Sequence, residues 1–87
     1  MLYIFYRPGS EQERSVMEFK KRLEDHRVPL ELVDLNTRNG AYKASAYGIM
    51  EFPAVAAVRE SDGSALRIWT GIMPTLSDAE HHARNSI

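Results

Sequence analysis

Ser10 and Glu13 are the two side chains whose types and spacing could support chemistry, at the corner where an apolar run leads into a helical stretch. A serine hydroxyl becomes a nucleophile only beside a general base, and a glutamate one helical turn away is a candidate base. The same spacing is a capping box, in which the serine side chain accepts a backbone N–H and the glutamate reaches back. The capping box is the simpler interpretation, so we expect this pair to begin a helix without doing chemistry.

The composition excludes several classes of site. The 87 residues include no cysteine, which rules out thiol catalysis, disulfides and thiolate metal sites. His81 and His82 are adjacent, so on a helix their side chains point about 100° apart. No set of histidines and carboxylates has the spacing of a metal site. We therefore expect no metal and no catalytic residues, and a non-enzymatic protein is favoured.

The length and the charge balance predict one folded domain over residues 1–87. Hydrophobic residues make up 44% of the chain and charged residues 26%, which is typical of a globular domain. The formal net charge is −1 with both signs interspersed, which argues against a nucleic-acid partner. The apolar run Leu2–Tyr6 has no basic segment before it and is too short to span a bilayer. We therefore expect no membrane partner and a cytoplasmic location.

Apolar runs and turn residues predict seven elements in the order β-α-β-α-β-β-α. The nearly continuous apolar run Leu2–Tyr6 is typical of a central strand that is buried on both faces. A helix is expected to begin at Ser10 and to be closed by Pro29. The other predicted elements are a strand over Leu30–Leu35, a loop over 36–40, a helix over Ala41–Tyr47 ended by Gly48, strands over Ala54–Val58 and Leu66–Thr70, and a helix from Asp78 to about Arg84 capped by Thr75 or Ser77.

These elements predict an α/β fold with a mixed four-stranded sheet and helices on both faces. The first two strands are joined by a helix, so they should be parallel with a right-handed crossover. The last two strands are joined by Asp62-Gly63, a dipeptide that supplies the positive φ of a hairpin turn and makes the strands antiparallel.

This order resembles the thioredoxin superfamily in its minimal, glutaredoxin-sized form. The corner of that fold carries Cys-x-x-Cys, and Ser10 and Glu13 stand at the corresponding positions. The resemblance therefore implies a redox fold without its redox chemistry. The stretches that carry it are Val33–Asn36, the run Tyr47–Val55 that is similar to Tyr-Gly-Ile-x-x-x-Pro-Thr, Gly71 followed by Leu76-Ser77, and the more glutaredoxin-like Arg7-Pro8-Gly9.

The resemblance also implies a cis bond before Pro53, which would expose the backbone N–H and C=O of Phe52 to an extended peptide. On this basis we expect a redox-inactive module that binds a peptide or protein segment, or serves as an adaptor, and the oligomeric state stays open. The residues of the implied ligand groove are Arg7, Pro8, Ser10, Glu13, Phe52, Pro53 and Gly71.

Two alternatives stay open. One is a glutathione-binding or transferase-like protein, because Arg7 stands where glutaredoxins often have a lysine that meets the tripeptide's terminal carboxylate. Glutathione is then the one candidate ligand, although Gly71-Ile72-Met73-Pro74 replaces the family's Gly-Gly-x-Asp pattern. The other alternative is a regulatory module that resembles KaiB-type proteins. A C-terminal half that departs from the β-β-α order would favour it.

Overall fold

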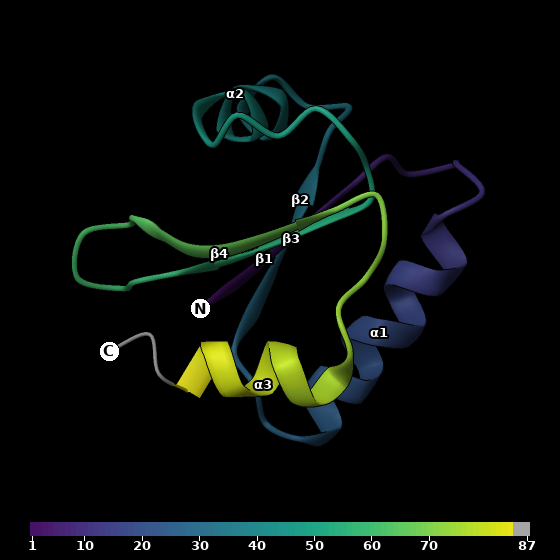
Figure 1. Ribbon diagram of the computed structural model, residues 1–87. Helices are drawn as coiled ribbons and strands as arrows, with labels where there is room; N and C mark the ends of the chain where they lie inside the picture. Colours follow the sequence, from purple (N-terminus) through teal and green to yellow (C-terminus); the bar gives the residue numbers. More distant parts are fainter. Residues whose placement is uncertain (85–87) are drawn as a thin grey trace.

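The computed structural model, which describes residues 1–84, places seven elements in the predicted β-α-β-α-β-β-α order (Figure 1). The strand order in the sheet is β2-β1-β3-β4. β1 pairs with β2 in parallel and with β3 antiparallel, and β4 pairs antiparallel with β3. The elements are β1 (Leu2–Tyr6), α1 (Glu13–Asp25), β2 (Leu30–Asp34), α2 (Arg38–Ala46), β3 (Ala54–Val58), β4 (Ala65–Thr70) and α3 (Leu76–Arg84).

Helices cover both faces of the sheet, as predicted. α1 and α3 lie on one face and α2 on the other (Figure 1). Each face has its own core cluster because successive strand residues point to opposite sides. The first cluster includes Leu2, Ile4, Val16, Phe19, Leu23, Val55 and Ala79. The second includes Phe5, Val33, Leu35, Ala44, Ile49, Ala54 and Ala56. The fold class predicted from the sequence is therefore confirmed.

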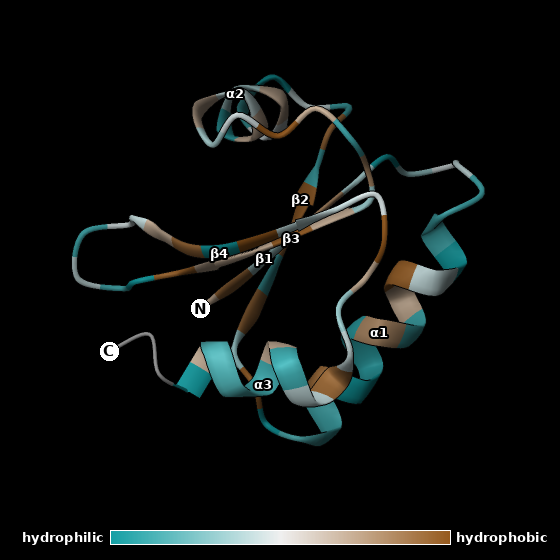
Figure 2. Cartoon of the chain, in the orientation of Figure 1, coloured by the Kyte–Doolittle hydropathy of each residue, from teal (hydrophilic) through white to brown (hydrophobic). Residues whose placement is uncertain are grey.

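The two central strands supply most of the buried sheet surface. Leu2, Ile4 and Phe5 of β1 are 0% exposed, and every residue of β3 is buried. The strands carry much of the apolar sequence, whereas the tip of the β3–β4 hairpin is mainly hydrophilic (Figure 2). In that hairpin Gly63 has a φ of 73°, which is the positive-φ residue that the Asp-Gly turn predicted.

The predicted start of the first helix was wrong. α1 begins at Glu13, and its N-cap Gln12 makes no side-chain capping hydrogen bond. The preceding residues form a turn instead, in which the Ser10 N–H donates to the Arg7 carbonyl over 3.2 Å and Gly9 has a φ of 82°. Proline followed by a positive-φ glycine is the sequence of a type II turn. This turn occupies Ser10, so the expected capping box does not form.

The helix also ends earlier than predicted. α1 stops at Asp25, and Arg27 follows with a φ of 57°. The Val28 N–H donates to the Leu23 carbonyl over 2.9 Å, and the Arg27 N–H donates to Glu24 over 2.9 Å. These two bonds form a Schellman motif, so hydrogen bonding, and not Pro29, ends the helix.

The segment predicted as a loop over 36–40 contains the start of α2. Thr37 Oγ1 accepts the Gly40 N–H over 2.9 Å and donates to the Asp34 carbonyl over 2.7 Å. Thr37 is therefore an N-cap that also attaches the helix to the end of β2. At the other end Gly48, with a φ of 71°, follows the helix as predicted.

Two side-chain contacts attach α3 to the end of α1. Arg84 Nη2 lies 2.6 Å from Glu80 Oε1 and 3.4 Å from the His26 carbonyl. The His26 Nδ1 lies 3.5 Å from Glu80 Oε2. At the start of the helix Thr75 Oγ1 accepts the Asp78 N–H over 3.1 Å, so Thr75 is the cap among the two predicted candidates.

The Glu80 contacts predict a pH-dependent contribution to stability. The Arg84 hydrogen bond, together with the charges of Arg84 and His26, lowers the pKa of Glu80 below 4.5. Because the folded-state pKa is lowered, this stability is present above the unfolded pKa and is lost as the pH falls through the folded pKa.

We expect Glu80→Gln to lower the melting temperature at neutral pH. The difference from the parent should shrink below about pH 4.5 and vanish once the parent's carboxylate is protonated. Thermal melts across the acid range measure this difference. Glu11→Gln, at an exposed glutamate with no ion pair among the described residues, is the control and should show no difference. An equal loss at every pH would mean that the carboxylate charge is not what Glu80 contributes.

Candidate functional site

A cavity of about 420 Å³ lies where β1 and β2 end and β3 begins. In α/β sheets this edge, at the carboxyl ends of parallel strands, is where ligands commonly bind. The volume falls within the usual range for small-ligand pockets. The lining residues are Arg7, Leu35, Ala41, Ala44, Ser45, Gly48, Ile49, Met50 and Phe52.

Small side chains of α2 leave the space for this cavity. Ala41, Ala44 and Ser45 lie three and four positions apart, so they share one face of the helix. Ala44 is buried against the second core cluster, whereas Ala41 and Ser45 are exposed. Ala44 on this face of α2 therefore packs into the core, whereas Ala41 and Ser45 line an open, mainly apolar cavity.

Arg7 brings the one charged side chain to the wall of this cavity. The residue is exposed, and within residues 1–84 it takes part in no ion pair. Because the other lining residues carry no carboxylate, the charge of Arg7 is not neutralised inside the site. The cavity therefore offers apolar walls and one cation.

Phe52 contributes both a side chain and free backbone groups. Its half-buried ring packs against the second core cluster and lines the cavity. Among the described residues neither its N–H nor its carbonyl takes a backbone hydrogen bond. Met50, which is 88% exposed, lines the same cavity. The cavity thus lies beside backbone groups that an incoming chain can pair with.

The Phe52–Pro53 peptide bond is cis, and Pro53 connects this segment to the β4–α3 loop. The Pro53 carbonyl accepts the Gly71 N–H over 3.0 Å. A β-carbon at Gly71 would lie 3.1 Å from Glu51 Oε2, so the two loops are in contact there as well. The next residue, Ile72, is 74% exposed. An exposed apolar residue therefore stands on the second loop as well as on the first.

The strand-to-helix corner does not form a reactive pair. Ser10 Oγ is buried and has no hydrogen-bond partner in the described part of the chain. The Glu13 carboxylate therefore does not activate Ser10, although the Glu13 N–H donates to the Ser10 carbonyl over 3.2 Å. The arrangement that an activated serine requires is not present.

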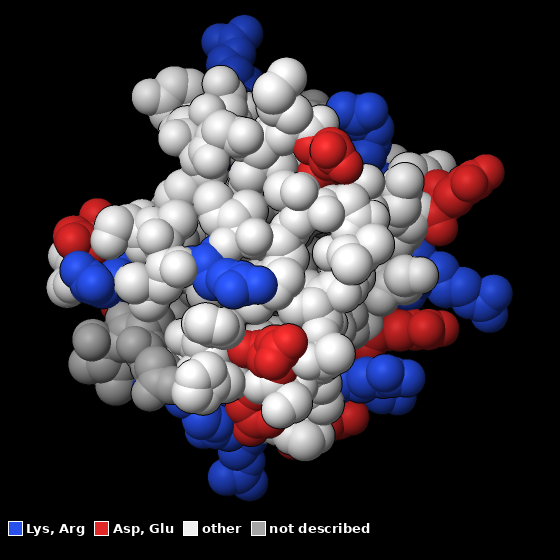
Figure 3. Space-filling model, viewed as in Figure 1, with Lys and Arg blue, Asp and Glu red and all other residues white. Residues whose placement is uncertain are grey.

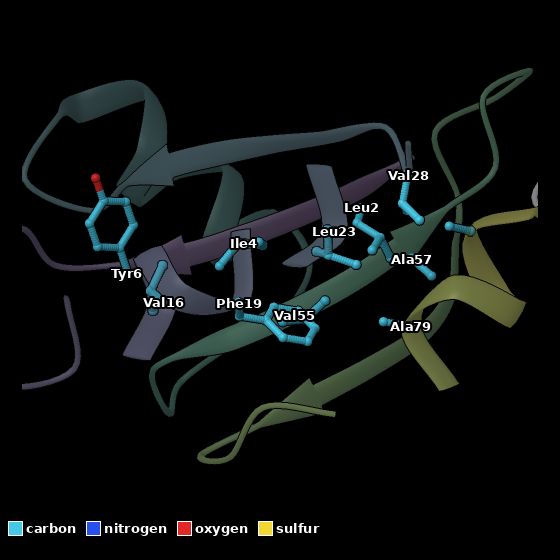
Figure 4. Close-up of a cluster of buried hydrophobic side chains, with 11 residues drawn as sticks. Leu2, Ile4, Tyr6, Val16, Phe19, Leu23, Val28, Val55, Ala57 and Ala79 are labelled. Atoms are coloured by element: carbon cyan, nitrogen blue, oxygen red, sulfur yellow. The ribbon is translucent and has the colours of Figure 1, made fainter. Parts of the chain in front are cut away.

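Tyr6 lies at the end of β1, just before this corner, and its pKa is raised. Burial raises the pKa of Tyr6, and the carboxylates of Asp34 and Glu13 raise it further. Figure 4 shows its hydroxyl at one end of the first core cluster, directed away from the other labelled side chains. The phenol therefore stays protonated at neutral pH and cannot act there as a base.

The predicted groove residues divide into two groups. Arg7 and Phe52 meet on the cavity wall, whereas Pro8, Ser10, Glu13, Pro53 and Gly71 do not line it. Pro53 and Gly71 are joined by their hydrogen bond, and the Pro8 carbonyl accepts from Asn36 Nδ2 over 3.4 Å. Sequence reasoning missed Met50 and the α2 wall. The signal for that wall was the small-residue spacing in α2.

The charged and metal-ligating side chains of the described residues form neither a charged patch on the face shown nor a metal site. On the face seen in Figure 3, acidic and basic side chains are interspersed without a continuous patch of one sign. Within residues 1–84 no three His, Cys, Asp or Glu side chains gather where they could hold a metal ion. No helix in the same range combines the length and apolar character needed to cross a membrane.

No protein-family model matches this chain, and no curated protein matches it either.

Proposed function

We propose that this chain is a redox-inactive, thioredoxin-like protein that binds an extended peptide or protein segment at the cavity between α2 and Phe52. The segment pairs its backbone with Phe52, and one of its apolar side chains enters the cavity beside Arg7. Such a module serves as an adaptor and not as an enzyme. The cytoplasmic location expected from the sequence remains part of this proposal.

The free backbone groups of Phe52 are the observation that carries the proposal. An N–H and a carbonyl that have no partner within residues 1–84, next to the start of β3, can receive one more extended chain in the way that an exposed strand does. The adjoining cavity of about 420 Å³ supplies a place for a side chain, which gives such pairing its specificity.

Glutathione binding is the second candidate, and Arg7 is the observation that favours it. A guanidinium that forms no ion pair with the described residues, on the wall that Phe52 also lines, suits a carboxylate of the tripeptide. The third candidate, a KaiB-like regulatory module, is favoured less because the C-terminal half follows the β-β-α order.

The cavity can be tested by filling it. A peptide selected from a display library of random heptapeptides is the probe, and its affinity is measured by calorimetry. Ser45→Leu places a larger side chain on the cavity wall and should weaken binding by about tenfold or more. Ala46→Leu adds a leucine to the same helix outside this cavity and should leave the affinity unchanged.

Equal affinities of the two variants and the parent would contradict the proposed position of the ligand. Glutathione is titrated in parallel. If glutathione binds, if the library yields no binding peptide, and if Arg7→Gln abolishes glutathione binding, the second candidate replaces the first.

A further inference from the structure

β4 is an exposed edge strand, and the proposed peptide site does not use it. Within residues 1–84 it stands at the end of the sheet, next to β3 alone. Every residue of β4 is exposed or half-buried, whereas every residue of β3 is buried. The strand therefore presents a free edge with accessible side chains on both sides.

The hydrogen bonds of the hairpin show which peptide groups of β4 face outward. The Gly71 N–H donates to the Pro53 carbonyl, and Thr70 stands opposite Ala54. Because peptide groups alternate in direction along an antiparallel strand, those of Trp69 and Arg67 face β3. The groups of Ile68 and Thr70 face away from β3. Leu66 has no counterpart in β3, because the register shifts between Ala57 and Val58, so the alternation holds only from Arg67 onward. Two donors and two acceptors are thus in line for another strand.

The two edges of the sheet differ in charge. The β2 edge carries Glu31, paired with Lys43 over 3.2 Å, and ends at Asp34. Charged side chains of this kind discourage edge-to-edge pairing. β4 has the sequence ALRIWT, with Arg67 as its one charge and several residues of high strand propensity. Of the two edges, β4 is the less charged, and its regular part after the register shift at Leu66 is open to pairing.

We infer that β4 pairs antiparallel with β4 of a second copy of this chain, about a two-fold axis through Ile68. In this register Ile68 stands opposite the partner's Ile68, and Arg67 stands opposite the partner's Trp69. The outward N–H and carbonyl of Ile68 then bond to the same groups of the partner's Ile68. The two four-stranded sheets become one continuous sheet.

The charge of Arg67 argues against one neighbouring register, and the affinity of Arg67 for a Trp69 ring favours the axis at Ile68 over one at Trp69. Residues that face each other across antiparallel strands lie on the same face of the sheet. The two-fold axis must therefore lie midway between the two copies of one residue, which then stand opposite each other. An axis through Arg67 would place it against the partner's Arg67, and like charges directly opposite are unfavourable. An axis through Ile68 instead places Arg67 against the partner's Trp69, twice by symmetry.

Arg67 and Trp69 already suit such a contact. Within one chain the Arg67 Cζ lies 5.5 Å from the centre of the Trp69 ring, inside the range of a cation–π interaction. In the two-fold register this pair is of the non-hydrogen-bonded type, in which opposing side chains come closest. The edge of β4 is therefore complementary to itself, which is the condition for a symmetric dimer.

Sedimentation equilibrium over about 10 µM to 1 mM tests the pairing. The parent's average mass should rise with concentration from 9.9 kDa towards twice that value. Arg67→Glu removes the attraction to the partner's Trp69 and should weaken association by about tenfold or more. Arg38→Glu makes the same charge change at an exposed position of α2 and should associate like the parent.

Amide hydrogen exchange at both ends of the concentration range locates the interface. The amide of Ile68 should exchange more slowly at the high concentration in the parent and in Arg38→Glu, but not in Arg67→Glu. A mass of one chain at every concentration overturns the proposal and leaves the edge to an extended segment of another protein. A dimer in which the Ile68 amide stays unprotected also overturns it, because the interface then lies elsewhere.

Discussion

Gly40→Ala is expected to lower the free energy of unfolding by about 3 kcal/mol, although alanine is the better helix former. A β-carbon at Gly40 would overlap the Asp34 carbonyl oxygen, and it would lie 2.7 Å from the Asp34 carbonyl carbon and 2.9 Å from Thr37 Oγ1. Two of these three atoms belong to the backbone, so the first turn of α2 must move away from the end of β2. The movement also breaks the cap that Thr37 provides.

Denaturant unfolding of Gly40→Ala measures this loss, with Ser45→Ala as the matched control. Ser45 is exposed in the same helix, and its side chain makes no hydrogen bond with the described residues, so alanine there should keep or slightly raise the stability. Parent-like stability of Gly40→Ala would contradict the close packing of α2 on β2. The wall of the proposed site would then be misplaced as well.

Phe5→Ala is expected to lower the free energy of unfolding by about 4 kcal/mol. Phe5 is 0% exposed, and its ring centre lies 6.4 Å from that of Tyr3 and 6.3 Å from that of Tyr47, both at steep angles. Truncation removes the largest fully buried side chain of the chain's described part and leaves a cavity between the sheet and α2. In a domain of this size such a loss is a large fraction of the total stability.

The control for Phe5→Ala is Tyr42→Ala, which truncates an aromatic ring that is 75% exposed. We expect the control to change the stability by less than about 0.5 kcal/mol. Guanidinium titrations followed by circular dichroism compare the two variants with the parent. A loss at Tyr42 as large as that at Phe5 would show that the second core cluster is not where the structure places it.

The order of the elements could be predicted because burial dominates the central strands. The apolar run Leu2–Tyr6 can be satisfied only between two covering layers, and the sheet places it between β2 and β3. Asp62-Gly63 indicated the hairpin locally, because the turn needs a residue with positive φ and Gly63 supplies it. The apolar run depends on overall hydrophobicity and the turn depends on residues close in sequence. Both can be recognised from a single sequence.

The boundaries of α1 and α2 could not be predicted because two local signals competed at each. Pro8-Gly9 favoured a turn that includes Ser10, and this turn displaced the capping box that the Ser-x-x-Glu spacing suggested. At α2 the composition of residues 36–40 indicated a loop, but Thr37 caps the helix by bonding both Gly40 and the end of β2. That second bond depends on tertiary structure.

The candidate site was predicted only in part for the same reason. Arg7 follows β1 and Phe52 precedes β3. Both strand ends lie at the same edge of the sheet, so the topology brings the two residues together. Met50 and the α2 wall depend on how the helix is seated on the sheet, which no local pattern specifies. Ser10 and Glu13 lie at the corner between β1 and α1, as predicted, but they do not line the cavity.

A two-dimensional amide NMR titration with the selected heptapeptide shows whether an extended segment binds at the cavity beside Phe52. We expect saturable shifts concentrated at Arg7, Ser45, Met50, Phe52 and Gly71, which are the residues of the cavity and of the loop joined to it. The same titration of Ser45→Leu should show these shifts only at much higher peptide concentration. Shifts confined to β4, or to the outer surfaces of α1 and α3, would contradict the proposed binding site, because the cavity beside Phe52 would then bind no extended segment.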